Sequence, residues 1–125
     1  PARAVEARAA AEAILSALDY VGVMGVELFE TESGLAVNEI APRVHNTGHW
    51  TLDACLVDQF EQHVRAICGW PLGDGSRHSD AVSTNLLGAE AEAWAEIAGD
   101  PALALHLYCK GEACPGRKMG HVTRL

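Results

Sequence analysis

Two apolar segments joined by a short polar turn constrain the fold of this chain more than any other feature. Residues 20–30 (YVGVMGVELFE) and 35–41 (LAVNEIA) each have the length and the apolar content of a strand. The segment ETESG between them ends in Gly34, which can adopt the positive φ that a tight turn requires. The pattern predicts an antiparallel hairpin that closes near residues 32 and 33.

Acidic residues in this predicted hairpin indicate a metal site. The hairpin places Glu27 opposite Glu39, or opposite Asn38 in the register one residue away. Two facing carboxylates repel each other, and an unpaired charge is costly to bury in an apolar strand. A bound cation resolves both problems, and oxygen-only ligands suit Mg²⁺, which completes its shell with water and phosphate oxygens. The alternative is that Glu27 points to solvent from an edge strand.

The hairpin is followed by the polar segment PRVHNTGHW. Pro42 and Gly48 exclude a regular helix here, so His45 and His49 are not expected to act as a helical zinc-binding pair. Arg43 carries a bidentate donor for phosphate or carboxylate, and His45 beside it is a candidate for binding an anionic substrate. The alternatives are a surface salt bridge for Arg43 and a capping or hydrogen-bonding role for His45.

The remaining segments predict a mixed α+β fold with an internal boundary. The polar, turn-rich stretch at residues 72–79 separates a first part, residues 1–75, from a second part, residues 76–125. In the first part we expect an amphipathic helix at 4–19 and one continuous helix at 51–69, with Thr51 as its N-cap and Gly69 as its stop. In the second we expect strands at 80–88, 102–110 and 119–125, with a short helix at 91–99.

The charge of the chain limits its partners. A net charge of −8 argues against nonspecific nucleic-acid binding and against an anionic membrane surface. The concentrated basic patch is the loop KGEACPGRK, where Lys110, Arg117 and Lys118 indicate a phosphate clamp. The alternative is a solvated basic turn. The apolar runs are shorter than the roughly 18 residues that a membrane helix needs, and no signal peptide is expected.

The cysteines and the chain ends add two expectations. Cys55, Cys68, Cys109 and Cys114 form no CxxC pair, so free thiols in a reducing cytoplasm are expected. Pro1 leads directly into a predicted helix, and GHVTRL reads as a strand that stops abruptly. We therefore expect the chain to be a piece of a longer protein.

These motifs together resemble a known family. The segments GVMGVELFE and GLAVNEIAPRVHNTGHWT are similar to the metal-binding end of an ATP-grasp domain. With QFEQHVRAICGWPLGD and YCKGEACPGRKMGHV, they resemble most closely the N5-carboxyaminoimidazole ribonucleotide synthetases of purine biosynthesis, over essentially the whole chain. The resemblance implies the back portion of an ATP-grasp domain followed by a small, mostly-β C-terminal module.

The resemblance also implies a reaction and its cofactors. This family uses ATP and Mg²⁺, or Mn²⁺ in its place, to join bicarbonate to the amine of 5-aminoimidazole ribonucleotide, through carboxyphosphate. The full-length enzyme is expected to be a cytoplasmic homodimer. By motif, Glu27 and Glu39 hold the metal, while Asn38 and Glu39 border ATP. Arg43 and His45 then line the carboxyphosphate and substrate site, and the substrate phosphate contacts three basic residues: Lys110, Arg117 and Lys118.

Two departures from the family pattern qualify these expectations. Cys114 stands where the family usually has an arginine before PGRK, so the clamp lacks one cation. The nucleotide-binding N-terminal domain and the ATP-contacting lysines of the family are absent from these 125 residues, so we expect the chain alone to be inactive. The alternatives are another ATP-grasp carboxylate–amine ligase, of the formate-dependent glycinamide ribonucleotide transformylase or biotin carboxylase type, and a non-catalytic metal- or nucleotide-binding module.

Overall fold

The computed structural model describes residues 2–125 and combines helices with small antiparallel sheets, which confirms the predicted α+β class. The chain forms two compact units. Unit 1 comprises Pro1–His49 and Val57–Gly75, and unit 2 comprises Trp50–Leu56 and Ser76–Leu125. The short segment 50–56 therefore belongs with the second half of the sequence.

Unit 1 contains the predicted hairpin. β1 (Gly25–Thr31) pairs antiparallel with β2 (Gly34–Ala41), and the two strands are joined by a two-residue turn. Gly34 has a φ of +136°, a conformation that a residue with a side chain rarely adopts. The hydroxyl of Thr31 donates to the Gly34 carbonyl at 2.8 Å and closes the turn. The predicted hairpin and the role of its glycine are confirmed.

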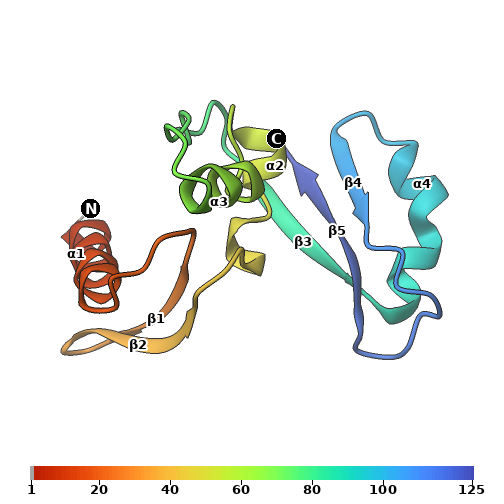
Figure 1. The fold of residues 1–125 in the computed structure, drawn as a ribbon. Helices are drawn as coiled ribbons and strands as arrows, with labels where there is room; N and C mark the ends of the chain where they lie inside the picture. The colour runs from red at the N-terminus through yellow and green to blue at the C-terminus, as the bar shows by residue number, and fades with distance from the viewer. Residues whose placement is uncertain (1) are drawn as a thin grey trace. The chain divides into compact units, whose positions relative to one another are not determined.

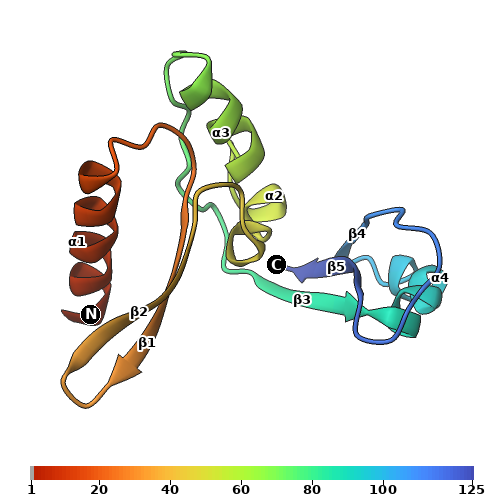
Figure 2. The ribbon, with the colours of Figure 1, turned by 60° about the horizontal axis from the view of Figure 1, so that its bottom comes forward.

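Helix α1 (Ala2–Ala17) lies alongside the hairpin in both ribbon views (Figures 1 and 2). Arg3 donates to the Glu30 carboxylate at 3.1 Å, and Glu6 accepts from the Leu35 amide at 3.0 Å. Val5 and Leu18 share the helical spacing of the apolar residues, but both are exposed and take no part in this packing. The half-buried stripe follows helical spacing through three alanines and two larger residues: Ala7, Ala10, Ala11, Ile14 and Leu15.

The continuous helix expected at 51–69 is wrong. The chain instead forms a short helix, α2 (Thr51–Ala54), and a second helix, α3 (Gln59–Ile67), with extended backbone at Cys55 between them. The N-cap of α2 is Trp50, so the N-cap expected at Thr51 is wrong. Cys55 forms a β-bridge with Arg77, and the Asp58 carboxylate caps α3 by accepting from the amides of residues 60 and 61. These long-range and capping bonds stabilise the break. The predicted stop at Gly69, with a φ of +66°, is confirmed.

Unit 2 is built on a three-stranded antiparallel sheet (Figure 1). β5 (Lys118–Arg124) lies between β3 (Val82–Leu87) and β4 (Leu103–Leu107). The 3₁₀ helix η2 (Gly88–Ala93) and helix α4 (Trp94–Ala98) connect β3 to β4, and α4 packs beside β4. The central strand is the most buried part of the sheet, and its residues Met119, His121 and Thr123 are nearly inaccessible.

Apolar residues remain exposed on the hairpin of unit 1. Phe29, Val37 and Ile40 have exposed fractions of 59%, 48% and 42%. A two-stranded hairpin that covers so little apolar surface is marginally stable by itself. The four cysteines are free, as predicted. Among the described residues, no helix is long and apolar enough to cross a membrane.

Candidate metal and phosphate sites

The two glutamates predicted to share a cation face each other across the hairpin. Glu27 is the direct partner of Glu39, and the register shifts by one residue between Glu27 and Leu28, whose partner is Val37. Asn38 is the extra residue of this β-bulge, and its amide donates to the Glu27 carboxylate at 3.4 Å. A bulge places two residues of one strand against one residue of the other. The bulge therefore brings Asn38 and Glu39 together against Glu27, where the sequence left a choice between them.

His45 completes this cluster from the loop that follows β2. Its Nε2 lies 3.3 Å from a carboxylate oxygen of Glu39 and 3.7 Å from one of Glu27. Ligand atoms of the three residues lie within 4.8 Å of one another. The Nδ1 of His45 accepts from the Thr47 amide at 3.4 Å, so the proton of the neutral ring belongs on Nε2, facing the carboxylates. In this tautomer the Nε2 proton of His45 faces the acidic pair at ion-pair distance.

Gln59 holds the loop that carries His45, a role that no sequence motif indicates. This side chain is buried; its Oε1 accepts from the His45 amide and its Nε2 donates to the His45 carbonyl, both at 2.9 Å. The same Nε2 lies 2.7 Å from the Nδ1 of His49. The tight packing of Gln59 against Gly48 leaves no room for a Cβ on that glycine. Gln59 thus fixes both ends of the 3₁₀ turn η1 (Asn46–Gly48).

Gly25 is a second residue of the site that was not predicted from the sequence. A Cβ built there would lie 2.7 Å from the Cβ of His45 and 2.8 Å from its Cγ, closer than real Cβ contacts. The imidazole therefore packs directly on the backbone at the start of β1. The signal in the sequence is a glycine inside a strand, which indicates a close approach by another group.

Arg43 lies on the same loop but outside the acidic cluster. Its guanidinium is exposed and donates to the carbonyl of Val44 at 3.0 Å. The Arg43 amide donates to the Ala41 carbonyl at 2.8 Å, which turns the chain sharply as it leaves β2. The structure therefore brings His45, and not Arg43, to the two glutamates.

Two of the three predicted clamp cations meet at one aromatic ring in unit 2. The ammonium groups of Lys110 and Lys118 lie 5.1 Å and 5.5 Å from the centre of the Tyr108 ring. Burial lowers the pKa of Lys118 from its usual value, and the charge of Lys110 lowers it further. Arg117 is exposed in the turn before β5, where its amide donates to the Cys114 carbonyl. An anion at Lys110 and Lys118 would relieve the repulsion between two nearby cations.

Comparison with known proteins identifies the family. The ATP-grasp domain model matches residues 1–60, and the phosphoribosylaminoimidazole carboxylase C-terminal domain matches residues 81–125. The N5-carboxyaminoimidazole ribonucleotide synthase of Brucella melitensis biotype 1 is 57% identical over 120 residues, which are 95% of this chain and 33% of the relative. The chain belongs to the N5-carboxyaminoimidazole ribonucleotide synthase family.

Solved structures of the synthases support the assignment. An N5-carboxyaminoimidazole ribonucleotide synthetase in complex with ADP matches with a TM-score of 0.92 and 43% identity, over 98% of this chain and 33% of that one. The Aspergillus clavatus enzyme in complex with ADP and 5-aminoimidazole ribonucleotide matches with a TM-score of 0.77 and 38% identity, over 82% of this chain and 30% of that one. This chain spans about a third of the length of the synthases it matches.

Proposed function

We propose that this chain supplies the metal site and the substrate-phosphate site of an ATP-dependent N5-carboxyaminoimidazole ribonucleotide synthase. The reaction joins bicarbonate to the amine of 5-aminoimidazole ribonucleotide and consumes ATP. The observation that carries the proposal is the cluster of Glu27, Glu39 and His45, formed at the bulge of the hairpin in the ATP-grasp part of the chain.

The acidic cluster fits Mg²⁺ better than a softer metal. Glu27 and Glu39 offer carboxylate oxygens, which Mg²⁺ prefers, and open positions remain for water and phosphate oxygens. Bound there, Mg²⁺ would neutralise charge on the nucleotide phosphates. Asn38, held against Glu27, borders the same ATP phosphates in this proposal. The Nε2 proton of His45 faces the carboxylates, so we assign His45 to orienting them instead of binding the metal through nitrogen.

We assign charged residues outside the acidic cluster to the other reacting groups. Arg43 is exposed and has a guanidinium fork suited to carboxyphosphate, and His45 lies on the same loop. Lys110, Arg117 and Lys118 receive the phosphate of the ribonucleotide. Phosphoryl transfer to bicarbonate depends mainly on positioning and charge neutralisation, which these residues provide.

The proposal extends to the compartment and the assembly of the enzyme. Four free thiols suit a reducing cytoplasm, and the family resemblance suggests a homodimer. The exposed apolar residues of the hairpin, Phe29, Val37 and Ile40, suit a surface on which the remaining two-thirds of a synthase packs.

A hybrid enzyme tests this function. In the hybrid synthase, residues 1–125 of this chain replace the matching third of the Brucella melitensis relative. We expect ADP formation that requires both bicarbonate and 5-aminoimidazole ribonucleotide, together with the carboxylated product. The 125-residue chain alone should hydrolyse no ATP. A folded hybrid that forms no such product, beside an active Brucella enzyme, would support a non-catalytic module instead.

A further inference from the structure

Tyr108 occupies a central position in the phosphate clamp, although nothing in the proposed reaction assigns it a role. Two clamp ammonium groups, those of Lys110 and Lys118, both lie over its ring. Cations are attracted to the face of an aromatic ring, so one ring can hold both groups that would otherwise repel each other. The side chain is partly buried, and burial raises the pKa of the Tyr108 phenol, which keeps it neutral.

The hydroxyl end of Tyr108 is fixed by a chain of polar groups that begins at a buried histidine. The oxygen lies 2.7 Å from Nδ1 of His121, which has an exposed fraction of 1%. The His121 ring stacks on the His106 ring, with centres 4.5 Å apart and planes 13° apart. The Nε2 of His106 lies 3.0 Å from both carboxylate oxygens of Asp53. The ring of Tyr108 is therefore held in place from the protein interior.

Asp53, His106 and His121 also have the composition of a metal site, since their ligand atoms lie within 4.8 Å of one another. The ring geometry argues against that reading. The lone pair of an imidazole nitrogen lies in the ring plane, so a shared ion must lie close to the planes of both rings. Two stacked planes only 13° apart offer no such point near both nitrogens. The cluster is better suited to fixing ring positions than to binding an ion.

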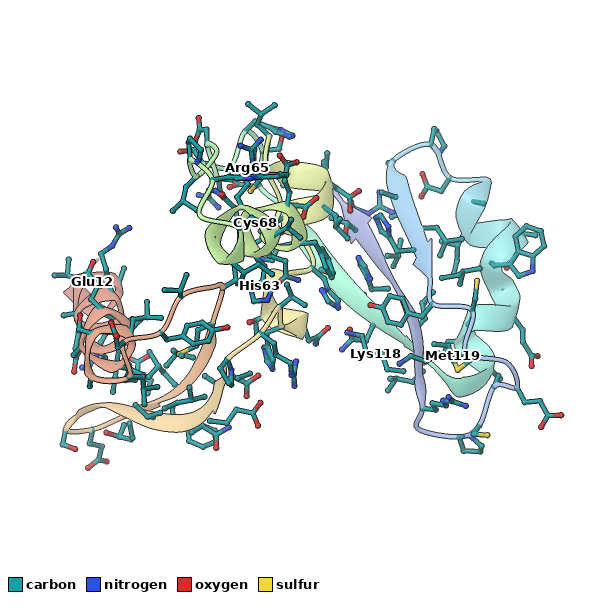
Figure 3. All side chains as sticks on the ribbon, viewed as in Figure 1. Glu12, His63, Arg65, Cys68, Lys118 and Met119 are labelled. Carbon is teal, nitrogen blue, oxygen red and sulfur yellow. The ribbon has the colours of Figure 1, made fainter. Side chains whose placement is uncertain are left out.

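A β-bulge explains how Lys118 reaches this ring. Leu86 pairs with Gly120 and Leu87 pairs with Lys118, so Met119 is the extra residue of β5. Leu86 and Leu87 are neighbours on β3, so they lie on opposite faces of the sheet. Each β5 residue lies on the same face as its β3 partner, so Gly120 and Lys118 are also on opposite faces. The bulge therefore turns Lys118 to the face of the sheet that carries His121. Figure 3 shows Lys118 and Met119 on different sides of β5.

We propose that Tyr108 is the positioning residue of the phosphate clamp: it holds Lys110 and Lys118 around one ring, and Asp53, His106 and His121 hold the ring. The inference rests on the proposed function and deepens it, because it explains how two cations stay side by side before a phosphate monoester arrives. The clamp is thereby preorganised, which reduces the ordering that the substrate must induce on binding.

Steady-state kinetics of the hybrid synthase test the inference. Tyr108→Leu removes the ring, and we expect the KM for 5-aminoimidazole ribonucleotide to rise about tenfold, the loss expected for two exposed cation–π contacts. Tyr108→Phe keeps the ring but releases its anchor, so a rise of about two- to fourfold is expected. The KM for ATP should stay unchanged in both variants, which separates positioning from a general loss of structure.

Control variants at another tyrosine and a direct binding measurement separate a role in the clamp from a general effect of losing a tyrosine. Tyr20 lies in unit 1 and donates to the Val23 carbonyl, so Tyr20→Leu and Tyr20→Phe control for loss of a tyrosine elsewhere. If Tyr108→Leu fails to fold, Tyr108→Phe is titrated with ribose 5-phosphate, and an affinity equal to that of the unsubstituted hybrid overturns the inference. An active hybrid in which Tyr108→Leu leaves both KM values unchanged, or raises both equally, also overturns it. An inactive unsubstituted hybrid instead contradicts the proposed function itself.

Discussion

Glu27 and Glu39 are direct partners across the β1–β2 hairpin, at the point where the pairing shifts by one residue. Facing like charges destabilise a sheet, so this pair is unfavourable for the hairpin unless a cation lies between them. Removing one of the two charges should therefore raise the stability of the metal-free chain and lower the activity of the synthase.

The first prediction concerns stability without metal. Glu39→Gln should raise the free energy of unfolding of the chain in EDTA by about 0.2–1 kcal/mol, because it removes one of two facing charges. Urea unfolding followed by circular dichroism measures this change. Glu32→Gln, in the turn between the strands, is the control and should have little effect. A clear loss of stability in Glu39→Gln would mean that the carboxylates do not repel each other in the folded chain.

A second prediction concerns the contact between Gly25 and His45. Gly25→Ala places a methyl group 2.7 Å from the Cβ of His45, so it should lower the free energy of unfolding by about 1–3 kcal/mol. The double variant Gly25→Ala/His45→Gly removes the Cβ and the ring that clash and should recover most of that loss. A double-mutant cycle by urea unfolding measures the coupling. Additive effects of the two substitutions would show that His45 does not pack on this strand.

Gln59 gives a third prediction, with a matched control on the same helix. Gln59→Leu should lower the free energy of unfolding by about 2–4 kcal/mol, because the amide and carbonyl of His45 lose their partner. Gln62 makes the same pair of backbone bonds to Gly73, away from the acidic cluster. Gln62→Leu should therefore also destabilise the chain.

Activity distinguishes the two glutamine variants. In the hybrid synthase at a temperature where both are folded, Gln59→Leu should lower kcat/KM for bicarbonate, because the loop that carries His45 loses its support. Gln62→Leu should keep kcat/KM near that of the unsubstituted hybrid. Equal losses of activity in both variants would reduce the role of Gln59 to stability alone.

A fourth prediction concerns the pH dependence of the contact between α1 and the hairpin. Hydrogen bonds from Arg3 and from the Leu35 amide lower the pKa of the Glu6 carboxyl below its usual 4.5. A carboxyl with a lowered pKa in the folded state stabilises the chain above its unfolded pKa, and this contribution disappears as the pH falls through the folded value. Glu6→Gln should therefore lower Tm at pH 7 and have progressively less effect below pH 4.5.

The control for this pH dependence lies on the same helix. Glu12, labelled in Figure 3, is exposed on α1, and Glu12→Gln should change Tm little anywhere between pH 3 and pH 7. Thermal unfolding of the three proteins between pH 3 and pH 7 provides the comparison. A difference between the native chain and Glu6→Gln that stays constant over this range would contradict the assignment.

The sequence predicted those features that depend on local pattern. The hairpin follows from two strand-like segments around a turn glycine, and the helix stop at Gly69 follows from its positive φ. The break at Cys55 was not predictable, because its β-bridge partner Arg77 is distant in sequence and residues 51–69 read as one helix. Long-range pairing overrode helix propensity there.

Both candidate sites depend on bulges, which the sequence does not reveal. Asn38 and Met119 are each an extra residue in a strand, and each bulge re-aims the functional residue beside it. The sequence allowed either Glu39 or Asn38 to face Glu27, and the bulge places both residues against Glu27. A signal for the Tyr108 cluster did exist: His106, Tyr108 and Lys110 alternate along HLYCK with the period of a strand. Their partner His121 was visible only in the pairing of β4 with β5.

Bicarbonate-dependent ADP formation by the hybrid synthase carrying Glu39→Gln, at physiological Mg²⁺, tests the central claim most directly. Loss of a metal ligand should lower this rate by about 100-fold or more, beyond the 10- to 100-fold typical of residues that only support a ligand. The same substitution should leave the fold intact, and Glu32→Gln should retain the full rate. Normal bicarbonate-dependent turnover in Glu39→Gln would contradict the assignment of Glu27 and Glu39 as the metal site.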